Sequence, residues 1–164
     1  MRHGQSLPAY LPRRAPRRSG PDPLSSRALL VVSATSKAPS ADAVTRAVVA
    51  TDGGPVTVMT VLGIRGSGLG VPHPGLLPTV PERDRGRAAI AAAIKAIEAR
   101  KVQARGEIAV TRAEARAIAR TARAVGATTV ILDLPEPHGL RRLIEGDLAA
   151  QLRRRLRGTA KVVR

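Results

Sequence analysis

The chain has 164 residues and a formal net charge of +16, with Tyr10 as its single aromatic side chain. This length predicts one domain of ordinary size with an extension, and a core built from Ala, Val, Leu and Ile. The absence of cysteine excludes disulfides, thiolate metal sites and a cysteine nucleophile. No apolar run approaches the ~20 residues of a membrane helix, so we expect a cytoplasmic protein without a membrane partner.

Residues 1–27 carry six arginines and one aspartate among Pro, Ser and Gly, and hold too few apolar side chains to form a core. We expect a disordered basic N-terminal extension here, followed by one α/β domain over residues 28–164. Pro8, Pro12 and Pro16 interrupt any secretory h-region and disfavour an amphipathic transit helix.

Residues 28–62 predict a strand, a helix and a second strand. The run 28–32 is continuously apolar, as expected at the centre of a parallel sheet. A helix over 41–51 follows, with Val44, Val48 and Val49 on its buried face, and a second strand covers 56–62. Two parallel strands joined by a helix form a β-α-β unit, which is right-handed in nearly every known case.

Residues 63–81 are rich in Gly and Pro and predict a long surface loop. Gly66, Gly68 and Gly70 suggest a phosphate loop, but their spacing is not G-x-G-x-x-G and no helix follows, so a flexible loop is favoured. A helix over 83–101 comes next, with its apolar stripe on Ile90, Ile94 and Ile97. The stretch 102–110 alternates imperfectly around Gly106, which suits a half-buried edge strand with Val102, Ala104, Ile108 and Val110 inward.

Thr111 is expected to begin the next helix in a capping box with Glu114. Ile118, Ala122 and Val125 form its predicted inner face, and Gly126 ends it before a fourth strand over 127–132. After the loop 132–147, Asp147 caps a helix with Leu148, Leu152 and Leu156 on one side, and residues 159–163 form a last strand. Arginines occupy the outer faces of both helices, at positions Arg112, Arg116, Arg120, Arg123, Arg153, Arg154, Arg155 and Arg157.

The order of these elements, with Gly139-Leu140-Arg141-Arg142-Leu143 before the last helix, resembles the universal stress protein family. The segment from Gly126 to Gly146 matches that family's fourth-strand region in register. The resemblance covers about residues 28–163 and implies an open five-stranded parallel sheet in the order 3-2-1-4-5, a Rossmann-like α/β fold with helices on both faces. It also implies, in many members, a homodimer.

ATP-binding members of that family carry Gly, two residues, Gly, nine residues, Gly and then Ser or Thr. In this chain those positions fall on Asp133, Glu136, Gly146 and Asp147. The spacing is kept, but carboxylates add bulk and like-charge repulsion where a phosphate would approach the backbone. The family's strand-ending Asp is also replaced, because the first strand continues into Ser33.

We therefore expect a degenerate nucleotide site and no tightly bound cofactor, with at most weak binding of ATP or AMP. Gly139, Arg141 and Arg142 would lie near the phosphates and partly compensate through their charge. The residues of this vestigial site are Ser33, Ala34, Thr35, Gly139, Arg141, Arg142, Gly146 and Asp147.

Other chemistry is not favoured in the altered loop. Asp133, Glu136 and His138 are of types that bind divalent metals or transfer protons. Pro135 and Pro137 fix an extended path that does not require these groups to converge, so capping of backbone amides is the preferred interpretation. No Ser-His-Asp arrangement with a catalytic context is present, and we expect neither a metal site nor enzymatic activity.

Two functions remain open at this point. The first is a regulatory, dimeric stress-response protein, paired through its C-terminal edge strand because a bare apolar edge favours pairing. The second is a basic accessory protein that binds RNA, DNA or the ribosome through backbone electrostatics, since no aromatic in the domain can stack on bases. The nucleic-acid surface would consist of Arg112, Arg116, Arg120, Arg123, Arg153, Arg154 and Arg157.

Overall fold

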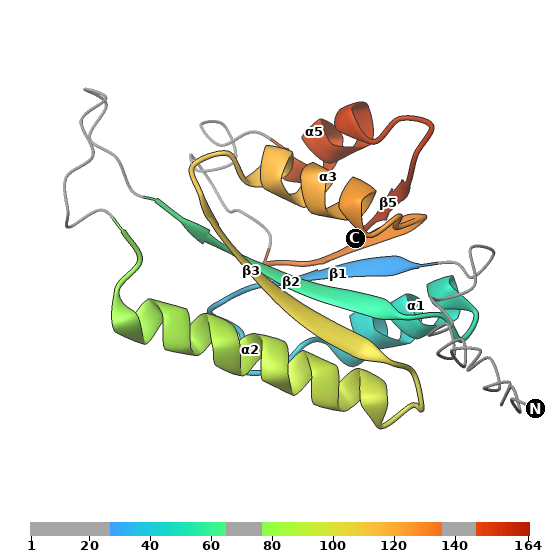
Figure 1. The fold of residues 1–164 in the computed structure, drawn as a ribbon, viewed down its shortest axis with the longest axis horizontal. Helices are drawn as coiled ribbons and strands as arrows, with labels where there is room; N and C mark the ends of the chain where they lie inside the picture. Colours follow the sequence, from blue (N-terminus) through green and yellow to red (C-terminus); the bar gives the residue numbers. More distant parts are fainter. Residues whose placement is uncertain (1–26, 65–76, 136–146) are drawn as a thin grey trace, which may run out of the picture.

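The computed structural model describes residues 27–64, 77–135 and 147–164, which form one α/β domain (Figure 1). The strands are β1 (Ala28–Val32), β2 (Val56–Gly63), β3 (Ala104–Thr111), β4 (Thr129–Asp133) and β5 (Lys161–Val163). The helices are α1 (Ala41–Thr51), α2 (Val80–Glu98), α3 (Glu114–Ala124) and α5 (Leu148–Arg155). Gly66, Gly68 and Gly70, where a phosphate loop was considered, lie outside the described residues.

All five strands are parallel and follow the order β3-β2-β1-β4-β5, which confirms the predicted sheet. The central strand β1 is buried along its whole length, because neighbouring strands and helices cover it on every side. Its continuous apolar sequence is the one expected for such a position. Since the strands are parallel, their carboxyl ends all meet at one edge of the sheet.

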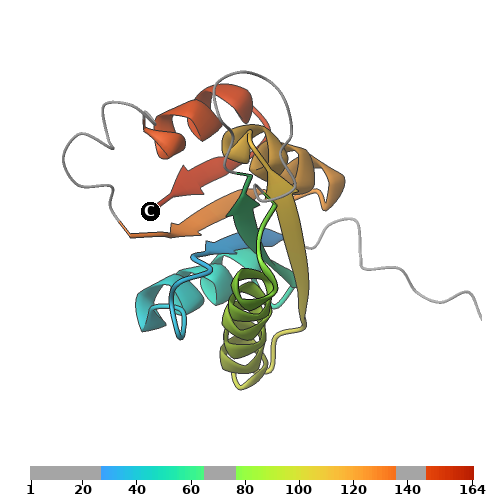
Figure 2. The same ribbon diagram turned by 90° about the vertical axis from the view of Figure 1, so that its left-hand side faces the viewer.

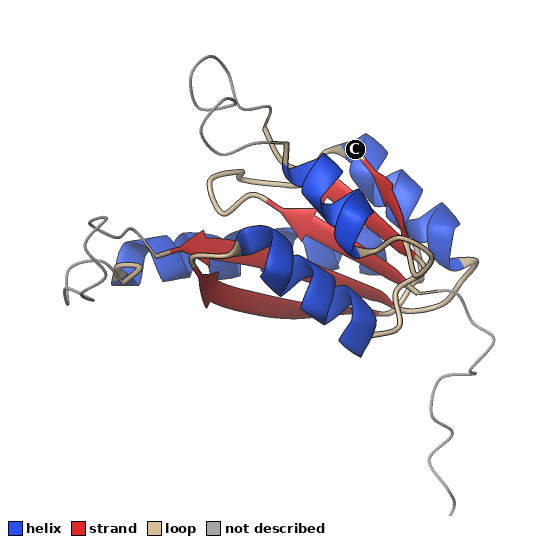
Figure 3. Cartoon of the chain, turned by 90° about the horizontal axis from the view of Figure 1, so that it is seen from above, coloured by secondary structure: helices blue, strands red, loops and turns tan. Residues whose placement is uncertain are grey.

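Helices cover both faces of the sheet (Figure 3), and a separate hydrophobic layer holds them on each face. On one face, Leu30 and Val32 pack with side chains of α1 and α2, including the fully buried Ile97. On the other face, Leu29 and Val31 pack with α3 and α5. The alternation of neighbouring β1 residues between these two layers is the two-residue period of a strand.

The predicted start of α2 was wrong by three residues. The helix begins at Val80 because Thr79 caps it: the Thr79 hydroxyl accepts from Glu82 N, and the Glu82 carboxylate accepts from Thr79 N at 2.8 Å. Pro81, which we assigned to the preceding loop, lies in the first helical turn, where its missing N–H costs nothing. The stripe of Ile90, Ile94 and Ile97 is confirmed.

Thr111 does not cap α3, contrary to the sequence prediction. It is the last residue of β3, opposite Gly63, and its carbonyl accepts from Ile64 N at 3.1 Å. The sheet therefore holds Thr111 in an extended conformation, and its hydroxyl accepts from Ala113 N at 3.0 Å. The helix begins at Glu114 with no side-chain cap, so Arg112 precedes it rather than lying on its outer face.

Two valines predicted to be buried are exposed. Val49 is 73% exposed because Ala47 and Thr51, which follow Val44 at helical spacing, complete the buried stripe of α1 in its place. Val110 is 44% exposed because β3 is the outer strand and α2 packs over the part of it around Gly106.

Arg27, which the sequence analysis assigned to the N-terminal extension, is tied to the domain. Its side chain donates to Val125 O at 3.0 Å, and its carbonyl accepts from Thr128 N at 2.8 Å.

Candidate functional site

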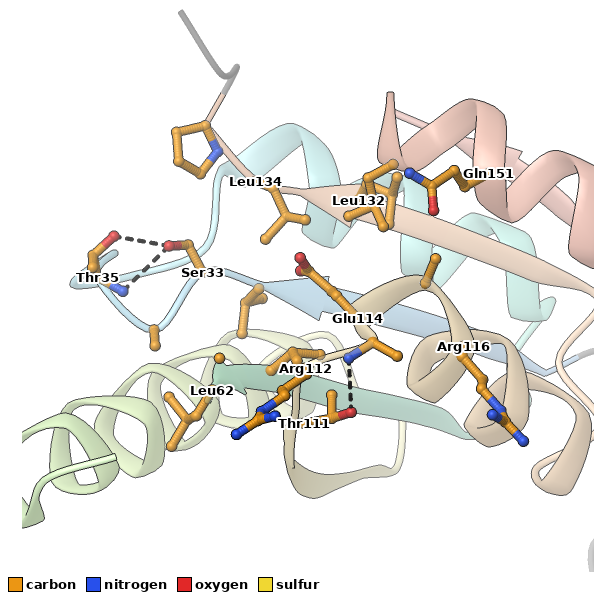
Figure 4. A pocket seen from close by; sticks show the side chains of 18 of the residues that line it. Ser33, Thr35, Leu62, Thr111, Arg112, Glu114, Arg116, Leu132, Leu134 and Gln151 are labelled. Atoms are coloured by element: carbon orange, nitrogen blue, oxygen red, sulfur yellow. Dashed lines mark hydrogen bonds between the residues drawn. The ribbon is translucent and has the colours of Figure 1, made fainter. Parts of the chain in front are cut away.

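An open cavity of about 1290 Å³ lies at the carboxyl edge of the sheet, where β1, β2, β3 and β4 end (Figure 4). Its walls come from those strand ends, from the first turns of α3 and α5, and from the amino-terminal end of α2. In an open α/β sheet, this edge is the place where ligands bind, beside the point at which the strand order reverses. Here the reversal falls between β1 and β4.

The end of β1 contributes Ser33, Ala34 and Thr35, which the sequence analysis assigned to a vestigial nucleotide site, to the cavity wall. The Ser33 and Thr35 hydroxyls lie 2.8 Å apart, and Thr35 N donates to the Ser33 hydroxyl at 3.2 Å (Figure 4). These short polar contacts fold the chain into a tight turn directly after the strand. The two hydroxyls therefore partner each other at the mouth of the cavity.

Asp133, the last residue of β4, is bound to the start of a different helix. Its carboxylate accepts from Ser40 N at 2.8 Å, and Ser40 is the N-cap of α1, whose hydroxyl accepts from Ala43 N. This contact joins residues 93 positions apart in the sequence. The carboxylate of Asp133 thus fastens the end of β4 to the beginning of α1.

Asp147 caps α5, as the sequence predicted. Its carboxylate accepts from Ala149 N at 2.9 Å, and the residue lies on the cavity wall. Helix N-termini attract anions through their free amides and the helix dipole. At α5 the protein's own carboxylate occupies that position.

Gly139, Arg141, Arg142 and Gly146 lie outside the described residues, as do Glu136 and His138 of the acidic loop.

Arginines that the sequence interpretation did not assign to this site also line the cavity. Arg85 comes from α2, Arg112 and Arg116 flank the start of α3, and Arg155 ends α5. Glu82, Glu114 and Asp147 supply the negative charges of the described wall, and Glu114 points into the cavity (Figure 4). The sequence could have placed both residues here, because Arg112 directly follows a strand whose end must lie at this edge and Arg116 lies in the first turn of the next helix.

A second group of arginines lies on the helices that cover one face of the sheet. Helices α3 and α5 contact each other, and both lie above the sheet in Figure 1. The exposed arginines of these two helices are Arg116, Arg120, Arg123, Arg153, Arg154 and Arg155, and Arg157 is exposed just after α5. Arg123 donates through its guanidinium to the carbonyl of Arg155, which fixes the carboxyl end of α5 against α3. We call this group the α3–α5 arginine face.

Within the described ranges, no three His, Cys, Asp or Glu side chains are grouped so that they could hold a metal ion. No helix in these ranges combines the length and the apolar character that crossing a membrane requires.

No protein-family model and no curated protein sequence matches the chain significantly. Solved structures do match it. A universal stress protein family member from Burkholderia pseudomallei superposes with a TM-score of 0.59 at 18% identity, covering 87% of this chain and 97% of that one. The universal stress protein from Archaeoglobus fulgidus gives 0.55 at 17% identity, covering 84% and 91%.

A third structure, the Archaeoglobus fulgidus universal stress protein in complex with dAMP, gives a TM-score of 0.49 at 16% identity, covering 84% of this chain and 95% of that one. That similarity is too low for its ligand to bear on this chain. The two better matches establish the architecture. This chain has the Rossmann-like α/β fold of the universal stress proteins, as its sequence resemblance implied.

Proposed function

We propose that this chain is a regulatory protein of the universal stress protein type with a degenerate nucleotide site. The observation that carries the proposal is the position of Asp147, whose carboxylate already accepts from the first-turn amide of α5. A phosphate at that helix end would have to displace the carboxylate or lie against it. Both alternatives weaken binding.

The end of β1 supports the same conclusion. Ser33 and Thr35 partner each other, so a ligand hydroxyl would compete with an existing hydrogen bond. On the opposite side, Asp133 adds a negative charge beside β1, while it secures the start of α1. The arginines of the cavity wall attract anions in general, but exposed guanidinium groups give little selectivity for a nucleotide.

We infer that the protein acts by binding partners rather than by catalysis. Among the described residues of the cavity wall there is no histidine, and the hydroxyls of Ser33 and Thr35 contact each other rather than a base. A nucleophile needs an adjacent base or a lowered pKa to react. Among the described residues, the hydrogen bonds of Ser33 and Thr35 include no such base.

Calorimetric titration of the full chain with ATP and Mg²⁺ tests the degenerate site. We expect no saturable binding in the micromolar range, for ATP or for AMP. Inorganic triphosphate serves as the comparison, because binding driven by charge alone would be similar for triphosphate and ATP. A micromolar dissociation constant for ATP, with much weaker binding of triphosphate, would overturn the proposal.

The α3–α5 arginine face favours a second candidate function, the binding of RNA, DNA or the ribosome. Six exposed arginines lie on two adjacent helices, and the described acidic residues on these helices and their caps are confined to their amino-terminal ends, at Glu114 and Asp147. Such a surface would follow phosphates without reading sequence. Fluorescence anisotropy with RNA and with duplex DNA over a salt series tests it. Undetectable binding at physiological salt would exclude this function.

A further inference from the structure

We propose that two copies of this chain pair through their β3 strands, antiparallel about a two-fold axis at Gly106, so that the two sheets become one. Strand β3 is eight residues long and borders the sheet beside α2 (Figure 2). Among the described residues it pairs with β2 alone. A long open edge of this kind is a template for pairing with another chain.

The hydrogen bonds to β2 show which backbone groups of β3 face outward. Val56 N donates to Gln103 O at 2.9 Å, and Ile64 N donates to Thr111 O at 3.1 Å. In a parallel pair, alternate residues direct both their N–H and C=O groups to the same neighbour. Residues 103, 105, 107, 109 and 111 therefore face β2, and the groups of Ala104, Gly106, Ile108 and Val110 face outward.

Those outward groups restrict the possible registers of an antiparallel partner. Each hydrogen-bonded pair must join two outward-facing residues, so Arg105 and Glu107 necessarily fall at non-hydrogen-bonded positions, where opposite side chains come closest. A two-fold axis at residue 105 would set Arg105 against the partner's Arg105. An axis at 107 would set Glu107 against the partner's Glu107. Both arrangements are repulsive.

With a two-fold axis at Gly106, the cross-strand pairs next to the axis are favourable on both faces of the sheet. It places Arg105 opposite the partner's Glu107 and, by symmetry, Glu107 opposite the partner's Arg105. Ala104 then meets the partner's Ile108 on the α2 side of the sheet, where both residues belong to the apolar layer. Opposite charges and apolar pairs are the cross-strand combinations that stabilise sheets.

Both charged side chains are held on the strand and remain exposed. Arg105 Nε donates to the Thr57 hydroxyl at 3.1 Å, and the Glu107 carboxylate accepts from the Thr121 hydroxyl at 3.1 Å. A guanidinium has five N–H donors and a carboxylate about four acceptor positions, so each retains capacity for a partner. Charges are also a common protection of sheet edges, but protection by repulsion requires like signs to meet.

Helix α2 adds a second complementary layer. Gly86 faces Thr60 and Leu62 of β2, whereas Ile90 and Ile94 face Gly106 of β3. Going round α2 from the side that faces β2 to the side that faces β3, helical spacing next places Arg87, Ala91 and Glu98, beyond β3. All three residues are exposed. In the proposed pair these three positions would face the partner's α2.

The spacing of the two helices suits direct packing. Because α2 lies over β2 and β3, the pairing sets the two α2 helices about two strand spacings apart, or ~10 Å, which is a usual distance for packed helices. The axis crosses near the Ile90–Ile94 turn. It therefore brings Arg87 towards the partner's Glu98.

The other open edge is less suited to pairing. Strand β5 has three residues, and Lys161 is exposed. The homodimer expected through the C-terminal strand would form few hydrogen bonds. Cysteine cross-linking at β3 and at β5 distinguishes the two edges.

Charge reversal and its rescue test the β3 pairing in the full chain. Sedimentation velocity over a concentration series measures the dimer dissociation constant. We expect Arg105→Glu to weaken the dimer by roughly tenfold or more, since it turns two attractive cross-strand pairs into repulsive ones. The double variant Arg105→Glu with Glu107→Arg should restore the dimer.

The rescue separates pairing from a merely structural role, because restoring opposite signs at positions 105 and 107 strengthens the dimer only if the two positions meet across the interface. Arg120→Glu, on the α3–α5 arginine face, is the control with the same change in net charge. A monomeric wild-type chain at high concentration, or a dimer that Arg105→Glu does not weaken, would overturn the proposal.

Cysteine cross-linking tests the register, and the chain has no cysteine of its own. Under mild oxidation, a mixture of Arg105→Cys and Glu107→Cys chains should give a mixed disulfide dimer in preference to either self-linked dimer. Val163→Cys reports on the β5 edge. Linkage through position 163 without linkage between 105 and 107 would assign the dimer to β5 and refute pairing through β3.

Discussion

Ile90 of α2 lies directly against Gly106 of β3: a Cβ atom at position 106 would be 2.3 Å from Ile90 Cγ2 and 3.3 Å from Ile94 Cδ1. No side chain fits that space. The close approach of α2 to the edge strand β3 therefore depends on a glycine. It also explains why the alternation of the strand is interrupted at this residue.

Gly106→Ala should destabilise the protein by about 1–3 kcal/mol, because α2 must move away from the sheet or Ile90 must leave its rotamer. Urea unfolding, followed by circular dichroism at low protein concentration, measures the change. Gly63→Ala is the matched control, since nothing lies within 4 Å of a Cβ atom there. An unchanged midpoint for Gly106→Ala would show that α2 adjusts freely.

Thr60→Val should destabilise the fold by ~1–2 kcal/mol without changing its core volume. The Thr60 hydroxyl is fully buried and donates to Val32 O at 2.9 Å, at the end of the central strand. Valine has nearly the same shape but leaves that carbonyl without this donor. Thr45→Val, at an exposed position of α1, should cost less than half as much in the same unfolding experiment. Equal effects would contradict a special role for the buried bond.

The strands could be predicted because each carries its own signal, whereas their order in the sheet was implied only by the family resemblance. β1 has no polar residue, as a strand covered on both faces requires, and Ile90, Ile94 and Ile97 repeat at helical spacing. The errors arose where one element constrains another. Thr111 has the sequence of a helix cap, but its pairing opposite Gly63 keeps it in β3.

The site was predictable in position but not in its contacts. Asp147 and Ala149 are neighbours, so the cap of α5 could be predicted from local sequence. The bond between Asp133 and Ser40 joins two distant segments, and no local pattern indicates it. Arg85 and Arg155 share one cavity only because the topology brings α2 and α5 to the same edge.

Asp147→Ser should preserve stability and strengthen anion binding. A serine hydroxyl also caps a helix, so the free energy of unfolding should stay within ~0.5 kcal/mol. Removal of the carboxylate relieves repulsion at the α5 amide, and we expect roughly two- to fivefold tighter binding of ATP and of triphosphate. Asp52→Asn, at the carboxyl end of α1, removes the same charge far from the cavity and should have no such effect. Equal gains in both variants would mean that net charge alone governs binding.

Arg120→Ala and Arg154→Ala should each weaken RNA binding and reduce its dependence on salt, if the α3–α5 arginine face binds polyanions. Each lost phosphate contact lowers the slope of log K against log salt concentration by about 0.7 for a single strand and 0.9 for a duplex. Lys95→Ala is the control: Lys95 is exposed on α2, across the sheet, and its loss changes the net charge equally. A slope that falls with the arginines and not with Lys95 assigns binding to the α3–α5 arginine face. A slope that falls equally in all three variants instead indicates a diffuse response to the overall charge.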